Sequence, residues 1–236
     1  MSKFSPTAAI SFGWNSFTKN VGFLILVTLI PLGFSLVSFT LIALIDYLVG
    51  KSLAGFVNIL LVPAFYYFSF VIALGTIKAI LNLLDKGQGD LSDLLIYTKN
   101  FMMLLNYLFA SILAGLIILG GFILFIIPGI YFSIRLSQFT YFLIDKNLGP
   151  VDAIKASWEA TKASMLNLMV FGFLSFLVIL AGAILFGIGL LVAAPIVTVA
   201  TVYVYRQLAG ASQIQTQDAP SPVQPVVPVA TPPAAG

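Results

Sequence analysis

A unit that recurs three times along the chain constrains its fold more than any other feature of the sequence. Each copy opens with a short amphipathic segment that ends in a Thr-Lys dipeptide, at Thr18-Lys19, Thr98-Lys99 and Thr161-Lys162. A long apolar run follows and is interrupted by a proline, at Pro63, Pro128 and Pro195. A repeated unit that cannot bury its apolar surface alone must stack against its copies. We therefore predict an all-α bundle of three hairpins.

The composition places this bundle in a membrane. Sixty per cent of the residues are hydrophobic and only 8% are charged, with a mean hydropathy of +1.09, whereas soluble domains carry about 25% charged residues. The net charge is only +3, so we expect no nucleic-acid partner. The partners expected are membrane lipids and a protein that binds the cytoplasmic helices or the C-terminal tail.

The chain contains no cysteine and no histidine. This removes disulfides, thiol catalysis, imidazole metal ligands and the usual general base near neutral pH. No arrangement of serine, lysine or acidic residues resembles a catalytic site. We therefore predict a protein that is not an enzyme and that uses no cofactor. The first twenty residues do not resemble a secretory signal, because the apolar run that follows them is too long.

Windows without charge locate six transmembrane helices. A membrane helix needs about 20 apolar residues. We place Pro63 and Pro128 at the start of a helix, where the missing N–H is harmless. Pro31 and Pro195 fall inside helices, where we expect kinks. The last hairpin is expected to turn at residues 186–189. The predicted helices are 20–45, 62–83, 100–126, 129–145, 164–186 and 189–209.

The six helices form one transmembrane domain over residues 1–210, with repeats at about 5–84, 88–146 and 149–209. Residues 211–236 are rich in proline and carry one charge, Asp218. We predict a disordered cytoplasmic tail. Its Pro222-x-x-Pro225-x-x-Pro228 spacing matches a docking motif, but an inert tail fits the composition as well.

Positive charges set the orientation. Lys51 falls on one side of the predicted spans, and nine basic residues fall on the other. Because lysine and arginine collect on the cytoplasmic side, both termini are predicted to be cytoplasmic, in a prokaryotic plasma membrane. The nine residues are Lys3, Lys19, Lys78, Lys86, Lys99, Lys146, Lys155, Lys162 and Arg206.

The cytoplasmic connections have helical patterns of their own. In the first, Ser5-Pro6 predicts a capped helix start, and one stripe follows with Ile10, Trp14, Phe17 and Val21. The third begins at Gly149-Pro150, and its stripe is Val151, Ile154, Trp158 and Met165. The third also has a stripe of small residues, Ala153, Ala156, Ala160 and Ala163. We predict interfacial helices that Trp14 and Trp158 anchor among lipid headgroups. The alternative is that these segments extend the spans into the cytoplasm.

Arg135 is the one basic residue well inside an apolar stretch. A charge within the bilayer costs about 2.5–3.5 kcal/mol on insertion scales, so such a residue usually has a function. Asp46 lies at the outer end of the first span at a comparable depth, and one hypothesis pairs the two residues. In the alternative, Arg135 reaches outer headgroups and Asp46 is in water.

Other polar residues have structural explanations. Asn58, Asn106 and Asn167 lie in or near the spans and are expected to bond between helices rather than to bind substrate. Asp85, Asp90 and Asp93 cluster in a cytoplasmic loop, but their spacing matches no calcium loop. Asp90 as an N-cap explains part of this cluster, so we predict no metal site.

Two stretches resemble a known family. They are Ile126-Ile127-Pro128-Gly129-Ile130-Tyr131-Phe132-Ser133-Ile134-Arg135 and Leu148-Gly149-Pro150 through Trp158 to Lys162. They look like the prokaryotic six-helix membrane domain that is attached to some glycerophosphoryl diester phosphodiesterases and also occurs alone in uncharacterised multipass proteins. The resemblance implies a membrane module without a settled activity, because the phosphodiesterase chemistry belongs to a separate barrel domain.

The function predicted from the sequence is thus a non-enzymatic membrane module that engages lipid or a partner protein. The alternative is a transporter or channel for a small or lipidic solute, which the repeated hairpins favour. The scarcity of charges within the spans argues against ion or proton coupling. A water-filled cavity lined by Arg135 and the asparagines would support transport, whereas a packed bundle with an exposed Ala or Trp groove would support the module.

Overall fold

A computed structural model of the protein describes residues 4–184 and 189–217. Within these ranges the chain is helical and contains no strand, as predicted. The expected turn at 186–189 and most of the expected tail, residues 218–236, lie outside the described residues. The elements in chain order are α1 Pro6–Lys19, α2 Val21–Val49, α3 Lys51–Lys86, η1 Leu91–Lys99, α4 Phe101–Leu124, α5 Ile126–Arg135, α6 Phe139–Lys146, α7 Pro150–Thr161, η2 Lys162–Ser164, α8 Met165–Ile184 and α9 Leu190–Gln217.

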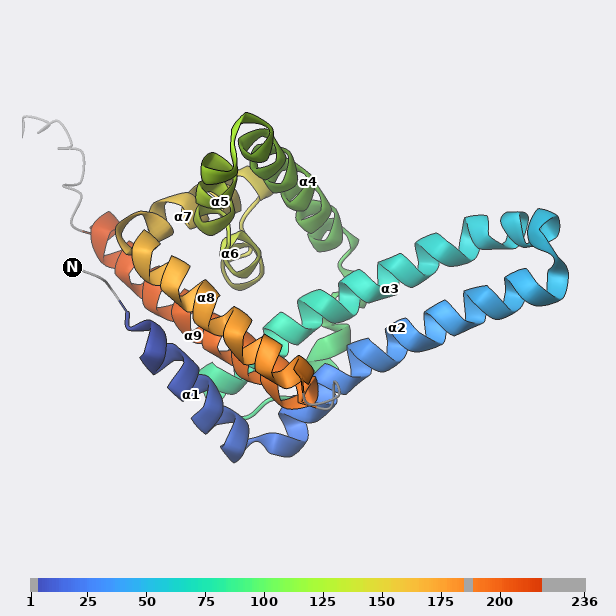
Figure 1. The fold of residues 1–236 in the computed structure, drawn as a ribbon, viewed down its shortest axis with the longest axis horizontal. Helices are drawn as coiled ribbons and strands as arrows, with labels where there is room; N and C mark the ends of the chain where they lie inside the picture. Colours follow the sequence, from blue (N-terminus) through green and yellow to red (C-terminus); the bar gives the residue numbers. More distant parts are fainter. Residues whose placement is uncertain (1–3, 185–188, 218–236) are drawn as a thin grey trace, which may run out of the picture.

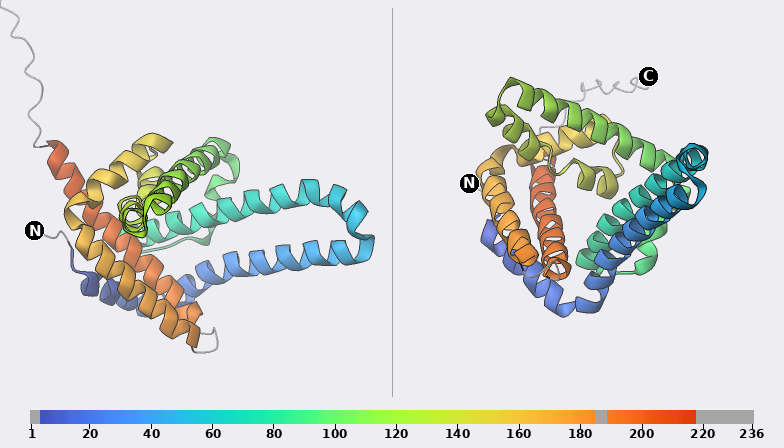
Figure 2. Two further views of the ribbon diagram at one scale, coloured as in Figure 1. Left: turned by 45° about the horizontal axis from the view of Figure 1, so that its top comes forward. Right: turned by 45° about the vertical axis from the view of Figure 1, so that its right-hand side comes forward.

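The helices form three groups around α9. α1 and α8 pack along α9, α4 to α7 form a second group, and the α2–α3 hairpin projects away from both (Figures 1 and 2). In the most apolar 18-residue stretch of α9, 44% is buried inside the protein. The corresponding share is 17% in each of the other four candidate spans. The central helix of the fold is therefore α9.

Five helical stretches are long and apolar enough to cross a membrane: Val21–Val49, Gly55–Lys86, Phe101–Leu124, Pro150–Ile184 and Leu190–Gly210. Their outer faces expose large apolar side chains, such as Phe39, Leu60 and Ile123, which are exposed by 74%, 76% and 78%. A surface of this kind is unfavourable in water and suits lipid. The fold therefore agrees with the predicted multi-pass membrane protein.

The first hairpin turns within a single residue. α2 and α3 meet at Gly50, whose φ of 77° favours glycine, so the predicted loop between residues 45 and 62 is helical instead. Pro63 consequently lies inside α3 rather than at its start, and that prediction is wrong. Membrane helices tolerate an internal proline because neighbouring groups can satisfy the freed carbonyl.

The predicted helix 129–145 is interrupted. α5 ends at Arg135 and α6 begins at Phe139, so residues 136–138 form a break in the expected span. Pro128 lies in the first turn of α5, close to where it was predicted.

α9 continues to Gln217, past residue 211, at which we expected the tail to begin.

α1 packs closely on α9 through small residues. Ser5 caps its N-terminus and Pro6 is its first residue, as predicted. Its buried face is Ala9, Gly13 and Phe17, because only a glycine at position 13 lets the helix approach the Ile196 carbonyl of α9. The predicted stripe is therefore shifted, and Trp14 remains 53% exposed.

The middle connection is a 3₁₀ helix that lies against α3. Asp90 caps η1 by accepting a hydrogen bond from the Ser92 N–H at 2.8 Å. The Tyr67 hydroxyl of α3 donates to the Thr98 carbonyl at 2.6 Å. A side chain at Gly75 would collide with the Leu94 backbone, so this glycine permits the contact.

Replacing Gly75 should test that contact. Gly75→Ala forces α3 and η1 apart, and overpacking of this kind typically costs about 1–3 kcal/mol. We expect a lower thermal unfolding temperature in detergent micelles. Gly33→Ala in α2 is the matched control, since open space surrounds its added Cβ, and it should leave stability unchanged or raised. Equal effects of the two substitutions would contradict the packing argument.

Candidate functional site

The break between α5 and α6 leaves backbone groups that α7 satisfies. The Ser157 hydroxyl donates to the Arg135 carbonyl at 2.9 Å, and its oxygen accepts the Gln138 N–H at 3.2 Å. The Thr161 hydroxyl also reaches the Arg135 carbonyl, at 3.1 Å. Both side chains are fully buried. Buried backbone groups outside a regular helix need such partners, so α7 fixes the break.

Arg135 lies at this break and is only 2% exposed. Its guanidinium carbon is 4.2 Å from the centre of the Trp158 ring and 5.8 Å from that of Tyr131. Its Nε has no hydrogen-bond partner among the described residues. Cation–π contacts are strongest where water is excluded, so the aromatic rings stabilise a cation that has no carboxylate beside it in the described chain.

The structure does not bring Arg135 and Asp46 together. Asp46 is exposed near the tip of the α2–α3 hairpin and accepts a hydrogen bond from the Asn58 amide at 2.8 Å. Arg135 belongs to the separate group of α4 to α7 (Figure 1). Asp46 therefore joins the two helices of its own hairpin, while aromatic rings surround Arg135.

The two tryptophans have different environments. Trp14 is more than half exposed on α1, whereas Trp158 is half-buried against Arg135. Ala153 and Ala160 of the predicted small-residue stripe are buried in α7, but Ala163 is exposed. The third connection thus packs inside the bundle more deeply than the first.

An apolar groove runs beside Trp14, between α1 and the α8–α9 hairpin. It encloses about 600 Å³, and an adjoining hollow of about 470 Å³ shares part of its wall. Ser11 supplies the only hydroxyl among the described residues that line the larger groove; the others are Ile10, Trp14, Val178, Ala181, Gly182, Gly189, Val192, Ala193 and Ile196. The chemistry of this surface suits a hydrocarbon chain.

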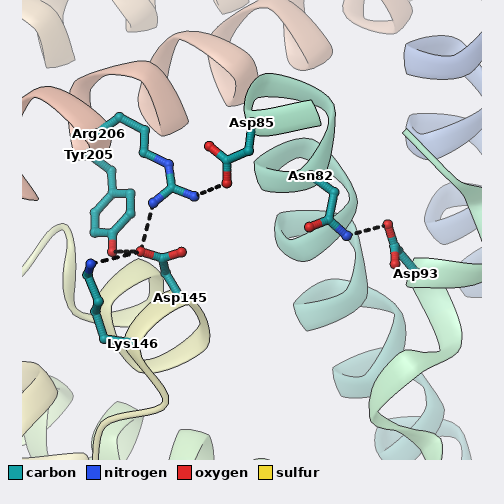
Figure 3. A network of polar contacts seen from close by, with 7 residues as sticks. All are labelled: Asn82, Asp85, Asp93, Asp145, Lys146, Tyr205 and Arg206. Carbon is teal, nitrogen blue, oxygen red and sulfur yellow. Dashed lines mark hydrogen bonds and ion pairs between the residues drawn. The ribbon is translucent and has the colours of Figure 1, made fainter. Parts of the chain in front are cut away.

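A polar junction joins three helices in the C-terminal half of α9 (Figure 3). Arg206 contacts Asp85 of α3 and donates to Asp145 of α6, the latter at 2.8 Å. The buried Tyr205 hydroxyl donates to the same Asp145 oxygen at 2.6 Å, and the Lys146 ammonium lies 3.9 Å from it.

Asp145 lies outside the five candidate spans, and its surroundings favour the charged carboxylate. Burial by itself would raise the pKa of Asp145. The hydrogen bonds from Tyr205 and Arg206, together with the nearby positive charges, outweigh burial and hold this pKa below the ordinary value. The junction is therefore an ion pair rather than a set of neutral hydrogen bonds.

The remaining polar residues from the sequence mostly have structural partners. Asn167 donates to the Phe4 carbonyl, and Asn106 is half-buried in α4. Asp93 accepts from Asn82 at 2.7 Å (Figure 3). The three clustered aspartates therefore separate, since Asp85 contacts Arg206 and Asp90 caps η1. Within the described ranges no group of acidic side chains is arranged to hold a metal ion.

Sequence reasoning missed Ser157, Thr161 and Gln138, which define the break. The available signal was a pair of hydroxyls four residues apart on α7. They lie on the face of the helix away from its charged residues, Asp152, Lys155, Glu159 and Lys162. Such a pair lies on one helix face. Its partners could not be identified, because the sequence predicted an unbroken helix through residue 138.

The fold and these sites define an all-helical, multi-pass membrane protein, and comparison with known proteins places it beside relatives of unassigned function. Uncharacterized proteins of Mycobacterium bovis and of two Mycobacterium tuberculosis strains are each 25% identical to it. These matches cover 98% of this chain and 75% of each relative. No family model matches the chain, and no solved structure is significantly similar to it.

Removing the Ser157 hydroxyl should destabilise the break. Ser157→Ala leaves the Arg135 carbonyl with one partner fewer and the Gln138 N–H with none, and a buried unsatisfied group costs about 1–3 kcal/mol. We expect a lower unfolding temperature in detergent. Ser35→Ala is the matched control, because the Ser35 hydroxyl is exposed and bonds only within α2. A Ser157→Ala protein as stable as the control would show that α7 does not fix the break.

The junction at Arg206 should make stability fall in acid. Folding lowers the pKa of the Asp145 carboxyl from its value in the unfolded chain, about 3.9. Above that pH the charged carboxylate stabilises the folded protein. This stabilisation is lost as the pH falls through the pKa of the folded state. Asp145→Asn removes this titration. We expect the wild type to unfold at a higher temperature than the variant near neutral pH, and the difference to shrink below about pH 4. A difference that is independent of pH down to about pH 2 would contradict this assignment.

Proposed function

We propose that this protein is a non-enzymatic membrane module that engages lipid through the apolar groove beside Trp14. The observation that carries the proposal is the groove itself, about 600 Å³ lined almost entirely by apolar side chains. In a multi-pass protein, an open apolar groove on the transmembrane helices α8 and α9 is bathed by acyl chains. Trp14 adds an amphipathic ring that prefers the headgroup region.

The proposed topology has six crossings, in which α5 and α6, as far as Ile144, together form the fourth. Both termini then lie in the cytoplasm of a prokaryotic plasma membrane, with η1 and α7 on that side, while α1 packs along α9 as far as the residues that line the Trp14 groove. The distribution of basic residues supports this orientation. The three hairpins, α2–α3, α4 to α6 and α8–α9, support the internal repeat.

The same proposal includes the relationship to the membrane domain of glycerophosphoryl diester phosphodiesterases. It rests on the two stretches around Pro128 and Trp158. The chain would share the membrane module and lack the hydrolytic chemistry. A protein partner could bind α1 or the proline-rich tail, the latter outside the described residues.

A second candidate function is transport of a small or lipidic solute. The break between α5 and α6 favours it, because many transporters bind their substrate where a transmembrane helix is interrupted. The groove favours the lipid module more directly, since it is already open and needs no change in conformation.

Fluorescence quenching by brominated lipid tests the proposal. In a Trp158→Phe background, Trp14 is the only tryptophan of the chain. The protein is reconstituted into vesicles of dibrominated phosphatidylcholine. We expect strong quenching of Trp14, and Ala181→Phe, which fills the groove, should relieve about half of it by keeping the acyl chain out.

Ala183→Phe is the matched control, because Ala183 is an exposed residue of the same helix that does not line the groove. It should leave the quenching unchanged. Equal quenching in the Ala181→Phe and Ala183→Phe proteins would show that lipid does not occupy the groove.

A further inference from the structure

A second cavity lies beside the break, on different residues from the Trp14 groove. It encloses about 320 Å³ between α5, the 136–138 turn, α8 and α9. Most of its accessible wall is apolar surface, to which Leu168 and Phe171 contribute. Five of its ten lining residues are polar: Ser133, Ser137, Gln138, Ser175 and Thr201. An apolar pocket with a small number of polar groups is the usual form of a ligand site.

Gln138 is the one lining residue of this cavity that carries a side-chain amide. It is 2% exposed, and its amide nitrogen donates to the Ser137 hydroxyl oxygen at 3.2 Å. Its carbonyl oxygen, Oε1, has no partner in the part of the chain that the structure describes. A buried polar atom without a partner costs about 1–3 kcal/mol, so a residue in the wall of the cavity carries an acceptor whose hydrogen bond the described protein leaves unmade.

The other polar atoms of the cavity can accept hydrogen bonds too. The hydroxyls of Ser133, Ser137 and Thr201 donate to carbonyls of their own chain segments at 2.8, 2.8 and 2.7 Å. Each of these protons is thereby used, and oxygen lone pairs remain. The Ser175 hydroxyl has no partner among the described residues and is free to accept. The C-terminal end of α5 adds the partial negative charge of its carbonyl groups, so the site is complementary to a hydrogen-bond donor.

The charge of the site favours a neutral donor. No acidic residue of the described chain lines the cavity, and the Arg135 cation lies at the same break, where it opposes a positively charged ligand. A hydroxyl group donates a hydrogen bond and carries no charge, so it suits the site. The geometry points to a binding site for the hydroxyl head of an uncharged amphiphile, and this inference does not rest on the proposed role of the Trp14 groove.

The position of the cavity favours a ligand from the bilayer. Gly172 lines it and is exposed, between apolar residues of α8 that also face outward, such as Val170 and Phe173. A molecule can thus enter from the lipid side, with its hydroxyls near Gln138 and its chain against Leu168 and Phe171. A free small polyol has the same donor chemistry and is the other source that an experiment must distinguish.

Binding of tritiated monooleoylglycerol to the full chain in nanodiscs tests the site. Unlabelled monooleoylglycerol should compete, whereas methyl oleate, which has the same chain and no hydroxyl donor, should compete at least about tenfold more weakly. Glycerol that competes as well as monooleoylglycerol would identify a polyol site instead of a lipid site. Equal competition by methyl oleate would overturn the proposed hydroxyl recognition.

Two variants locate the binding. Gly172→Leu places a side chain in open space at the mouth of the cavity and should reduce monooleoylglycerol affinity about tenfold or more. Gly115→Leu in α4 is the control, because open space surrounds its Cβ as well and Gly115 does not line the cavity. Gln138→Leu removes the unpaired acceptor and should weaken binding similarly without lowering the unfolding temperature. Unchanged affinity in the Gly172→Leu protein would exclude this cavity as the site.

Discussion

The arrangement of the hairpins depends on the polar junction at Arg206. In a bilayer the hydrophobic effect gives one apolar helix little reason to prefer another over lipid, so specific polar and close-packed contacts select the neighbours. Arg206 binds carboxylates from α3 and α6, and Tyr205 beside it completes the set. The junction thereby joins the first and second hairpins to the central helix α9, while the outer parts of α2 and α3 project away from the other helices (Figure 1).

The break between α5 and α6 is stabilised by a different set of contacts. A break between two helices leaves buried carbonyl and N–H groups that need partners within the protein. Ser157 binds both sides of the interruption, and Trp158 on the next position covers the Arg135 guanidinium. One turn of α7 therefore stabilises the backbone and the charge together. This arrangement leaves Gln138 incompletely paired at the edge of a cavity, where a ligand rather than the protein can complete its hydrogen bonds.

The groove and the cavity are two different kinds of surface with which the bundle can contact lipid. The Trp14 groove offers almost only apolar contact and therefore little choice among acyl chains. The cavity at the break adds directed acceptors, and unpaired buried polar groups discriminate strongly between ligands that do and do not satisfy them. α8 and α9 contribute to both sites, at successive levels of the same helix pair.

The sequence by itself determined that the chain is helical, apolar enough for a membrane, and capped at Ser5 and Asp90, because hydropathy and capping are local properties. It also indicated that Arg135 required an explanation. Only the tertiary structure decided the partners: Arg135 lies against Trp158 rather than Asp46, and Asp145 contacts Arg206 across 61 residues of sequence. It also decided the break at 136–138 and the position of Pro63 inside α3. These features depend on contacts between segments that are distant in the sequence. The energies of such contacts cannot be inferred from a local sequence pattern.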